Sequence, residues 1–136
     1  MAGMIRYMLD TNICIYLIKR KPVKVFNRFS KLKVGQICIS AITHSELEFG
    51  VSNSFHVEQN REALSEFLAP IDILDYPSGA SAYYGALRAD LKRKGTPIGA
   101  NDMLIAAHAI HSGLVLVSNN VKEFRRIKNL TVENWI

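Results

Sequence analysis

Apolar runs and amphipathic segments alternate along this chain. The apolar runs are continuous and rich in β-branched residues, which is typical of strands that are buried on both faces. They predict strands at residues 5–9, 36–41, 71–74 and 114–117, with a short edge strand at 131–133. Apolar positions at a helical period lie between these runs. They predict helices at about 11–19, from Pro22 until Gly35, and at 43–52, 56–69, 79–94, 100–111 and 121–125.

This order of elements predicts the fold class. Strands that alternate with helices are typical of an α/β fold with a central parallel sheet. We expect one domain over residues 4–136, with four or five parallel strands and helices on both faces. Residues 1–3 precede a second methionine, Met4, and have the character of a cloning remnant.

Composition narrows the class of protein. Hydrophobic residues make up 49% of the chain and charged residues 21%, as in globular rather than disordered proteins. The two cysteines, Cys14 and Cys38, lie in apolar runs without metal-type spacing. Since no run is long enough to span a bilayer and no signal-peptide pattern is present, we expect a cytoplasmic protein with reduced thiols.

The net charge of +5 favours an anionic partner, nucleic acid above all. Solvated helix faces explain such charges equally well. The basic residues gather in three clusters: Lys19, Arg20, Lys21, Lys24 and Arg28; then Arg88 and Lys92, Arg93, Lys94; then Lys122, Arg125, Arg126 and Lys128.

Polar residues stand at four positions that a parallel sheet brings to one edge. Asp10-Thr11-Asn12 follows the first strand, and Ser118-Asn119-Asn120 follows the fourth. Glu46 lies one turn into the helix after the second strand, and Asp102 opens a helix that is otherwise nearly all apolar. In open α/β sheets, ligands bind beyond the carboxyl ends of the strands.

Each position also has a simpler explanation as a helix start. Thr11 or Asn12, or Asp10 itself, can cap the first helix. Thr43 and Glu46 have the spacing of a capping box, and a helix dipole favours an acid at Asp102. Asn120 and Glu123 also have the spacing of a cap. Capping explains one acid at one helix start, but not the gathering of acids on one side of the sheet.

Carboxylates brought together repel one another and raise each other's pKa values. A hard divalent cation such as Mg²⁺ or Mn²⁺ removes that penalty, since it takes oxygen ligands. The chain has no set of cysteines and histidines suited to zinc. Acids with a basic rim therefore point to a metal-dependent site for a phosphate backbone.

Four stretches of the chain resemble the motifs of PIN domains, and more narrowly those of the VapC toxins of VapBC toxin–antitoxin pairs. They are MLDTNICIYLIK (8–19), SAITHSELEFG (40–50), GANDMLIAAHA (99–109) and LVSNNVKEF (116–124). Their order and spacing cover essentially the whole domain. The resemblance implies an endoribonuclease that depends on Mg²⁺ or Mn²⁺.

The resemblance also assigns roles to residues. Asp10, Glu46 and Asp102 match the three acidic metal-site positions of the family. The fourth position is often Asp in the family and is Asn120 here, which adds no charge and puts a second firmly held metal in doubt. In the implied reaction water attacks a phosphodiester and leaves a 5′-phosphate and a 3′-hydroxyl. The three residues expected to orient the carboxylates are Thr11, Asn12 and Ser118.

The partners implied by the resemblance are RNA and a VapB-type antitoxin, with operator DNA bound only through the antitoxin. The leading RNA target is tRNA, in particular the anticodon loop of initiator tRNA. A homodimer is a further family expectation, with candidate surfaces on residues 11–30 and 79–94. Four aromatics in these segments are either exposed there or part of the core: Tyr16, Phe26, Tyr83 and Tyr84.

Three alternatives remain open at this level. A metal-free ribonuclease would use histidines as acid and base; the chain has His44, His56, His108 and His111. A haloacid-dehalogenase-like phosphatase also has an Asp after its first strand, but it needs a second Asp where Asn12 stands. The third alternative is a catalytically weak PIN-fold module that binds RNA or a protein, which the Asn at position 120 would suit.

Overall fold

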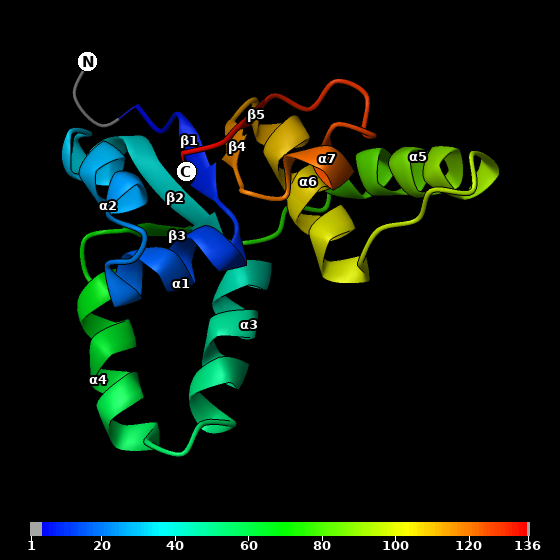
Figure 1. Ribbon diagram of the computed structural model, residues 1–136. Coiled ribbons are helices and arrows are strands. Elements are labelled where there is room, and N and C mark those ends of the chain that lie inside the picture. The colour runs from blue at the N-terminus through cyan, green and yellow to red at the C-terminus, as the bar shows by residue number, and fades with distance from the viewer. Residues whose placement is uncertain (1–3, 136) are drawn as a thin grey trace.

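Five parallel strands form the centre of the molecule (Figure 1). In this computed structural model, which describes residues 4–135, they are β1 (Tyr7–Leu9), β2 (Ile37–Ser40), β3 (Asp72–Leu74), β4 (Val115–Val117) and β5 (Val132–Glu133). Their order in the sheet is β3-β2-β1-β4-β5, and every neighbouring pair is parallel. The predicted α/β fold is confirmed. The predicted cloning remnant at residues 1–3 lies outside the described residues.

The helices also follow the predicted order. They are α1 (Thr11–Lys19), α2 (Val23–Ser30), α3 (Ala41–Ser52), α4 (Val57–Leu68), α5 (Ala80–Arg93), α6 (Ala100–Ser112) and α7 (Val121–Phe124). The largest difference is at α2, which ends at Ser30 rather than continuing toward Gly35. The intervening chain forms a short 3₁₀ turn, η1 (Val34–Gln36), before β2.

The sheet is covered by helices on both faces. Met8 and Cys38 point into a core shared with α5 and α6. Leu9 and Ile39, one residue further along the same strands, point into a second core with α1, α2 and α4. Because successive strand residues face opposite sides, a strand buried on both sides must be apolar throughout. This accounts for the continuous apolar runs in the sequence.

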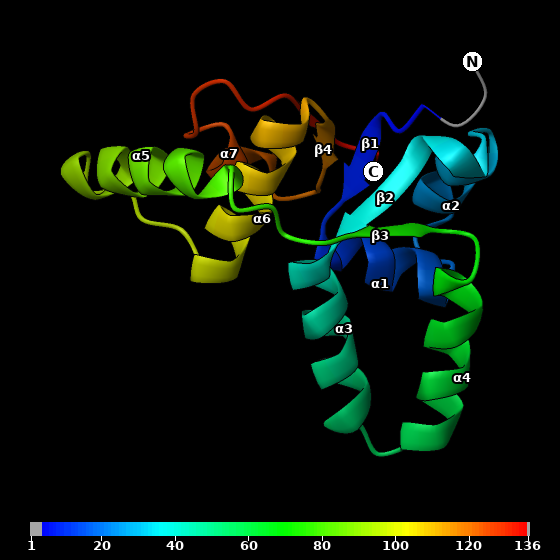
Figure 2. The same ribbon diagram turned by 180° about the vertical axis from the view of Figure 1, so that it is seen from behind.

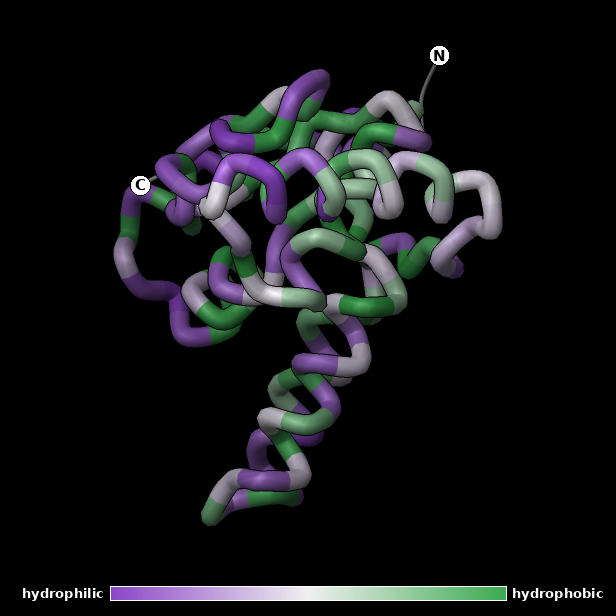
Figure 3. The backbone as a smooth tube through the Cα atoms, turned by 90° about the vertical axis from the view of Figure 1, so that its right-hand side faces the viewer, coloured by the Kyte–Doolittle hydropathy of each residue, from purple (hydrophilic) through white to green (hydrophobic). Residues whose placement is uncertain are grey.

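Helices α3 and α4 form a two-helix arm that projects from one side of the sheet (Figures 1 and 2). The side view shows it standing clear of the rest of the molecule, with hydrophilic and hydrophobic residues interleaved along it (Figure 3). At its base, α3 contacts both α1 and α6. Among residues 4–135, no helix combines the length and hydrophobicity needed to cross a membrane.

Candidate active site

Asp10 ends β1 and begins α1. Its backbone N–H donates to the Val117 carbonyl at 3.0 Å, which fixes it against the end of β4. Its carboxylate accepts from the Ile13 N–H at 2.9 Å, so Asp10 is the residue that caps α1. A cap from Thr11 or Asn12, the other choices that the sequence left open, is not formed. Only 3% of Asp10 is exposed.

The pKa of Asp10 is raised to about 6, chiefly by burial. The negative charges of Asp102 and Glu46 contribute to this rise, so these two acids lie near Asp10. Hydrogen bonds from the Ser118 side chain and the Ile13 amide oppose the rise. The carboxylate is thus held at the lip of the core, at an energetic cost that a cation would reduce.

Glu46 comes from the first half of α3, but not through the predicted capping box. Ser40 caps this helix: its hydroxyl accepts from the Ile42 N–H at 3.1 Å. The Thr43 hydroxyl is buried and has no hydrogen-bond partner among residues 4–135. Glu46 is bound by Thr11 instead, whose hydroxyl donates to Oε1 at 2.6 Å. This bond joins α1 to α3 and orients the carboxylate.

Asp102 lies in the first turn of α6, as predicted. Burial raises its pKa, and the charges of Glu46 and then Glu123 raise it further. Asp10, Glu46 and Asp102 therefore form one electrostatically coupled group, although they come from the cap of α1, from α3 and from α6.

Glu123 is a fourth acid beside this group, and the sequence treated it only as part of a helix cap. Asn120 stands at the start of α7 but makes no capping bond with its side chain. Its amide donates to Glu123 Oε2 at 2.8 Å, and its backbone N–H donates to the Ser118 hydroxyl at 2.9 Å. Asn120 thus holds Glu123 toward Asp102. The sequence feature that could have pointed to Glu123 is its place three residues after Asn120, which stands at the fourth position of the family motif.

The other two polar residues of the loops differ in setting. Asn12 is solvent-exposed, a position that suits contact with a substrate better than support of a carboxylate. Asn119 donates from its amide to the Tyr16 hydroxyl at 2.9 Å, which ties the loop after β4 to α1.

The donors available here are carboxylate, amide and hydroxyl oxygens, the ligands that Mg²⁺ and Mn²⁺ take. Among residues 4–135, no three Asp, Glu, His or Cys side chains are grouped so that together they could hold a metal ion. Mg²⁺ commonly uses one or two carboxylates and keeps several waters. The group therefore fits such an ion through a few direct ligands, with water or a substrate phosphate completing the shell.

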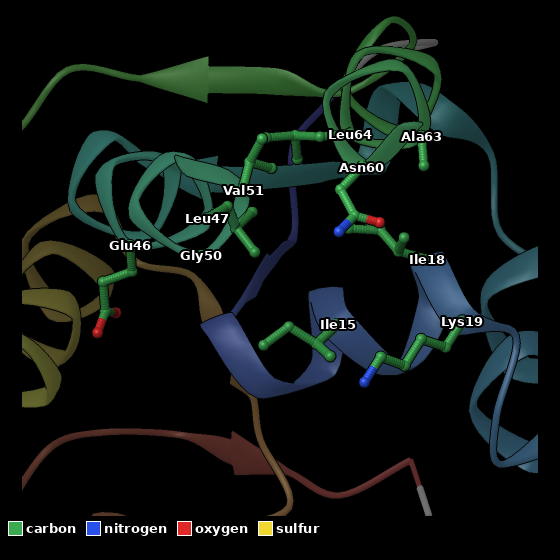
Figure 4. A pocket seen from close by; sticks show the side chains of 10 residues that line it. All are labelled: Ile15, Ile18, Lys19, Glu46, Leu47, Gly50, Val51, Asn60, Ala63 and Leu64. Carbon is green, nitrogen blue, oxygen red and sulfur yellow. The ribbon is translucent and has the colours of Figure 1, made fainter. Parts of the chain in front are cut away.

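Two hollows flank Glu46. One, of about 270 Å³, is largely apolar and lies between α1, α3 and α4, with Glu46 at one end and Lys19 at the other (Figure 4). The other, of about 440 Å³, is lined by Thr11, Ser45, Glu46, Phe49 and Asn101.

His108 lies in the core rather than at this edge of the sheet. His108 is 1% exposed, and its Nδ1 lies 2.9 Å from the Ser40 hydroxyl, inside the core. Burial lowers its pKa, which disfavours a charged imidazole. A histidine in this position cannot reach a substrate.

Comparison with known proteins agrees with the fold and the site. Residues 7–130 match the PIN domain family model. The chain is 46% identical to a protein named ribonuclease VapC2 from Haemophilus influenzae, covering 98% of this chain and all of the relative. It is 45% identical to the tRNA(fMet)-specific endonuclease VapC of Shigella flexneri, covering 97% and 99% of the two chains.

Solved structures lead to the same family. A chain of the Rickettsia felis VapBC2 complex bound to promoter DNA superposes with a TM-score of 0.91 at 48% identity, covering 98% of this chain and all of that one. A chain of the DNA-bound VapBC complex from Salmonella typhimurium has the same TM-score at 44% identity, with the same coverage. The chain therefore belongs to the PIN-domain family and, within it, to the VapC endoribonucleases, the toxins of VapBC toxin–antitoxin pairs.

Proposed function

We propose that this endoribonuclease depends on Mg²⁺ or Mn²⁺, cleaves tRNA, and uses Asp10, Glu46 and Asp102 as its metal-site residues. The observation that carries the proposal is the electrostatic coupling of these acids: the charges of Asp102 and Glu46 raise the pKa of Asp10, and that of Glu46 raises the pKa of Asp102. Such mutual repulsion is costly without a cation. PIN-domain ribonucleases generally use divalent metal ions.

In this mechanism Asp10 and Asp102 bind the ion, directly or through water. When bound, such an ion would supply charge stabilisation at the scissile phosphate and would make the attacking water more acidic. Glu46, held by Thr11, orients that water and accepts its proton. Ser118 and Asn120 keep Asp10 and Glu123 in place. Because water attacks rather than the ribose 2′-hydroxyl, the products carry a 5′-phosphate and a 3′-hydroxyl.

The proposed substrate is initiator tRNA, cut in its anticodon loop. Support comes from the relatives of Shigella flexneri and Salmonella typhimurium, which are 45% and 44% identical and are named tRNA(fMet)-specific endonucleases. Unpaired loop nucleotides are also the part of structured RNA that proteins read most readily.

The proposed protein partner is a VapB-type antitoxin, through which the complex would bind operator DNA. Relatives at 48% and 44% identity are found in VapBC complexes with DNA. The apolar hollow beside Glu46 suits an antitoxin segment, since its walls include Ile15, Ile18 and Leu47 and one end of it is at Glu46 (Figure 4).

A homodimer is also proposed. Of the four aromatics considered in the sequence, Tyr83 on α5 is 45% exposed. Tyr16 is hydrogen-bonded to Asn119, and Phe26 packs against a core. Tyr84 is partly buried, and its hydroxyl accepts from Arg88. The exposed face of α5 at Tyr83 is therefore the better candidate for the dimer contact.

The deciding experiment compares tRNA cleavage by the wild type, Asp10→Asn and Asp102→Asn in Mg²⁺, in Mn²⁺ and with EDTA. Asp90→Asn serves as the matched control, because Asp90 is an acid of α5 paired with Lys94. We expect cleavage only by the wild type and Asp90→Asn, and only with metal.

Cleavage by both site variants at the wild-type rate would refute the assignment of the acids. RNA binding by every protein without cleavage would instead favour the weak binding module that Asn120 suggests. Sequencing 5′-phosphate ends after brief expression identifies the RNA.

A further inference from the structure

Phe49 is an exposed aromatic side chain in the wall of the acidic site. It is 68% exposed, and it lines the 440 Å³ hollow together with Glu46 and Thr11. The volume falls within the range of small-ligand sites, roughly 300–1,000 Å³.

The helix places this ring beside the acids. Glu46 and Phe49 are three residues apart on α3, so their side chains are neighbours on one face, with Cβ atoms about 5–6 Å apart. Across the hollow stands Asn101, from the first turn of α6, the residue before Asp102. The hollow therefore extends outward from the acids along α3.

Core packing does not account for Phe49. The buried face of α3 is formed by Thr43, Leu47 and Val51. A single exposed apolar residue needs no explanation by itself. What distinguishes Phe49 is that its hollow is shared with a metal-site carboxylate and is otherwise lined by polar side chains.

We propose that Phe49 is a stacking platform for the nucleobase next to the scissile phosphate of a single-stranded RNA segment. This inference rests on the proposed ribonuclease function. Aromatic side chains bind unpaired bases by stacking, and they do so for any base, since every base has a π-face. A phosphate held at the acids has its flanking base within reach of the ring. Ser45 and Asn101 offer hydrogen bonds to that nucleotide.

The two hollows beside Glu46 differ in a way that favours RNA here. The hollow between α1, α3 and α4 is lined by aliphatic side chains such as Ile18, Val51 and Leu64, which suit an apolar protein segment. The hollow at Phe49 offers one aromatic ring among hydroxyl, amide and carboxylate groups. One flat apolar surface with a polar surround is the composition that a nucleotide requires.

Phe55 supplies a matched control. It is 101% exposed in the loop between α3 and α4, at the outer end of the arm, beyond the last turn of α3. A substitution there removes an exposed phenylalanine from the same arm without altering the hollow.

The experiment measures binding of total bacterial tRNA to proteins that carry Asp10→Asn, and cleavage of the same tRNA by proteins with Asp10 intact. Each background receives Phe49→Ala, Phe49→Leu, Phe49→Trp or Phe55→Ala. We expect Phe49→Ala and Phe49→Leu to weaken binding about 10-fold or more, and Phe49→Trp and Phe55→Ala to stay within two-fold of the parent. Cleavage by the Phe49→Ala and Phe49→Leu proteins should fall in parallel. Thermal melting checks that each variant folds.

Equal tRNA binding and cleavage by Phe49→Ala and its parent would overturn the inference. So would retention of binding by Phe49→Leu, since that would make the contact merely apolar. Failure of the wild type to cleave any tRNA in Mn²⁺ refutes the proposed function instead, and the binding series in the Asp10→Asn background still tests Phe49.

Discussion

Asp10 caps α1, and the metal-ligand role that we propose for it requires something different of its charge. As a helix cap it needs only an oxygen that accepts from the Ile13 N–H, which an amide supplies as well. In the proposed role of metal ligand it would have to be ionised beside Asp102 and Glu46 in a buried place. An ionised, buried carboxylate without a cation beside it lowers the stability of the fold.

The first prediction follows from the direction of this pKa shift. Since the pKa is about 6 in the folded protein and 3.8 without the protein environment, the folded state binds more protons between these values. The free energy of unfolding therefore falls as pH rises through this window, by about 3 kcal/mol. Asp10→Asn removes that loss. In EDTA, we expect it to be more stable than the wild type at pH 7.5 and no more stable near pH 4, as measured by urea unfolding.

Asp90→Asn is the control for charge removal, because the pKa of Asp90 is shifted in the opposite direction from that of Asp10. Lys94 holds the pKa of Asp90 below its usual range, so the charged form is favoured in the folded protein. No gain in stability is expected at pH 7.5. Mn²⁺ should narrow the gap between Asp10→Asn and the wild type by stabilising the latter. A destabilised Asp10→Asn protein at pH 7.5 would contradict the account of Asp10.

Sequence pattern and structure agree at residues whose position depends on the sheet alone. Asp10 and Ser118 directly follow parallel strands, so the pattern places them at one edge. The partner of Glu46 was not predictable, because Thr11 lies 35 positions away and its bond is tertiary. Glu123 was missed since its spacing from Asn120 is that of a helix cap, and only the fold brings it near Asp102.

At the scale of elements, a buried pair joins the two helices that carry Glu46 and Asp102. Ser40, at the end of β2, both caps α3 and hydrogen-bonds His108 of α6. Both residues are almost fully buried, at 0% and 1% exposure. A short local pattern cannot reveal such a link, because its members are 68 positions apart. The helices and strands themselves were predictable from the sequence, since the spacing of apolar residues within each one is characteristic of its type.

The second prediction tests this link. Ser40→Ala removes the cap of α3 and leaves the Nδ1 of His108 unpaired in the core, so we expect a loss of about 2–4 kcal/mol in the free energy of unfolding. Ser45→Ala is the matched control in the same helix. Its exposed hydroxyl donates only to the Ala41 carbonyl at 3.1 Å, so its loss should be about 0.5 kcal/mol or less. Equal losses for the two variants, measured by urea unfolding, would argue against a structural role of the pair.

At the scale of the whole molecule, the third prediction concerns the apolar hollow proposed for the antitoxin. Gly50 lies in its wall (Figure 4), and a Cβ atom added there meets no atom within 4 Å. Gly50→Leu should therefore fill the hollow without strain and improve helix propensity. We expect weaker binding of the cognate antitoxin with tRNA cleavage retained, measured by calorimetry and by a cleavage assay.

Gly85→Leu is the control for that experiment, because Gly85 lies within α5 and also has open space around it. It should leave antitoxin affinity unchanged. Unaltered antitoxin binding by Gly50→Leu would place the docking surface elsewhere on the toxin.

The fourth prediction uses the distribution of positive charge over the molecule. Lys122 and Arg125 flank Glu123, whose charge acts on Asp102, so they lie beside the acidic site. Lys92 and Arg93 lie at the end of α5 that points away from the sheet (Figures 1 and 2). Both pairs are exposed and carry the same charge. Each contact with a phosphate releases counterions. For a single strand, each contact makes the slope of log affinity against log salt steeper by about 0.7.

If RNA crosses the acidic edge of the sheet, removing Lys122 and Arg125 must weaken tRNA binding more than removing Lys92 and Arg93. We expect the double substitution Lys122→Ala and Arg125→Ala to weaken tRNA binding strongly at low salt, and to reduce the slope of log affinity against log salt by about one. The double substitution Lys92→Ala and Arg93→Ala should change both quantities much less, although the net charge falls equally. Fluorescence anisotropy in the Asp10→Asn background, across a salt series, measures both. Equal effects of the two pairs would mean that net charge alone attracts the RNA, and that neither cluster defines its path.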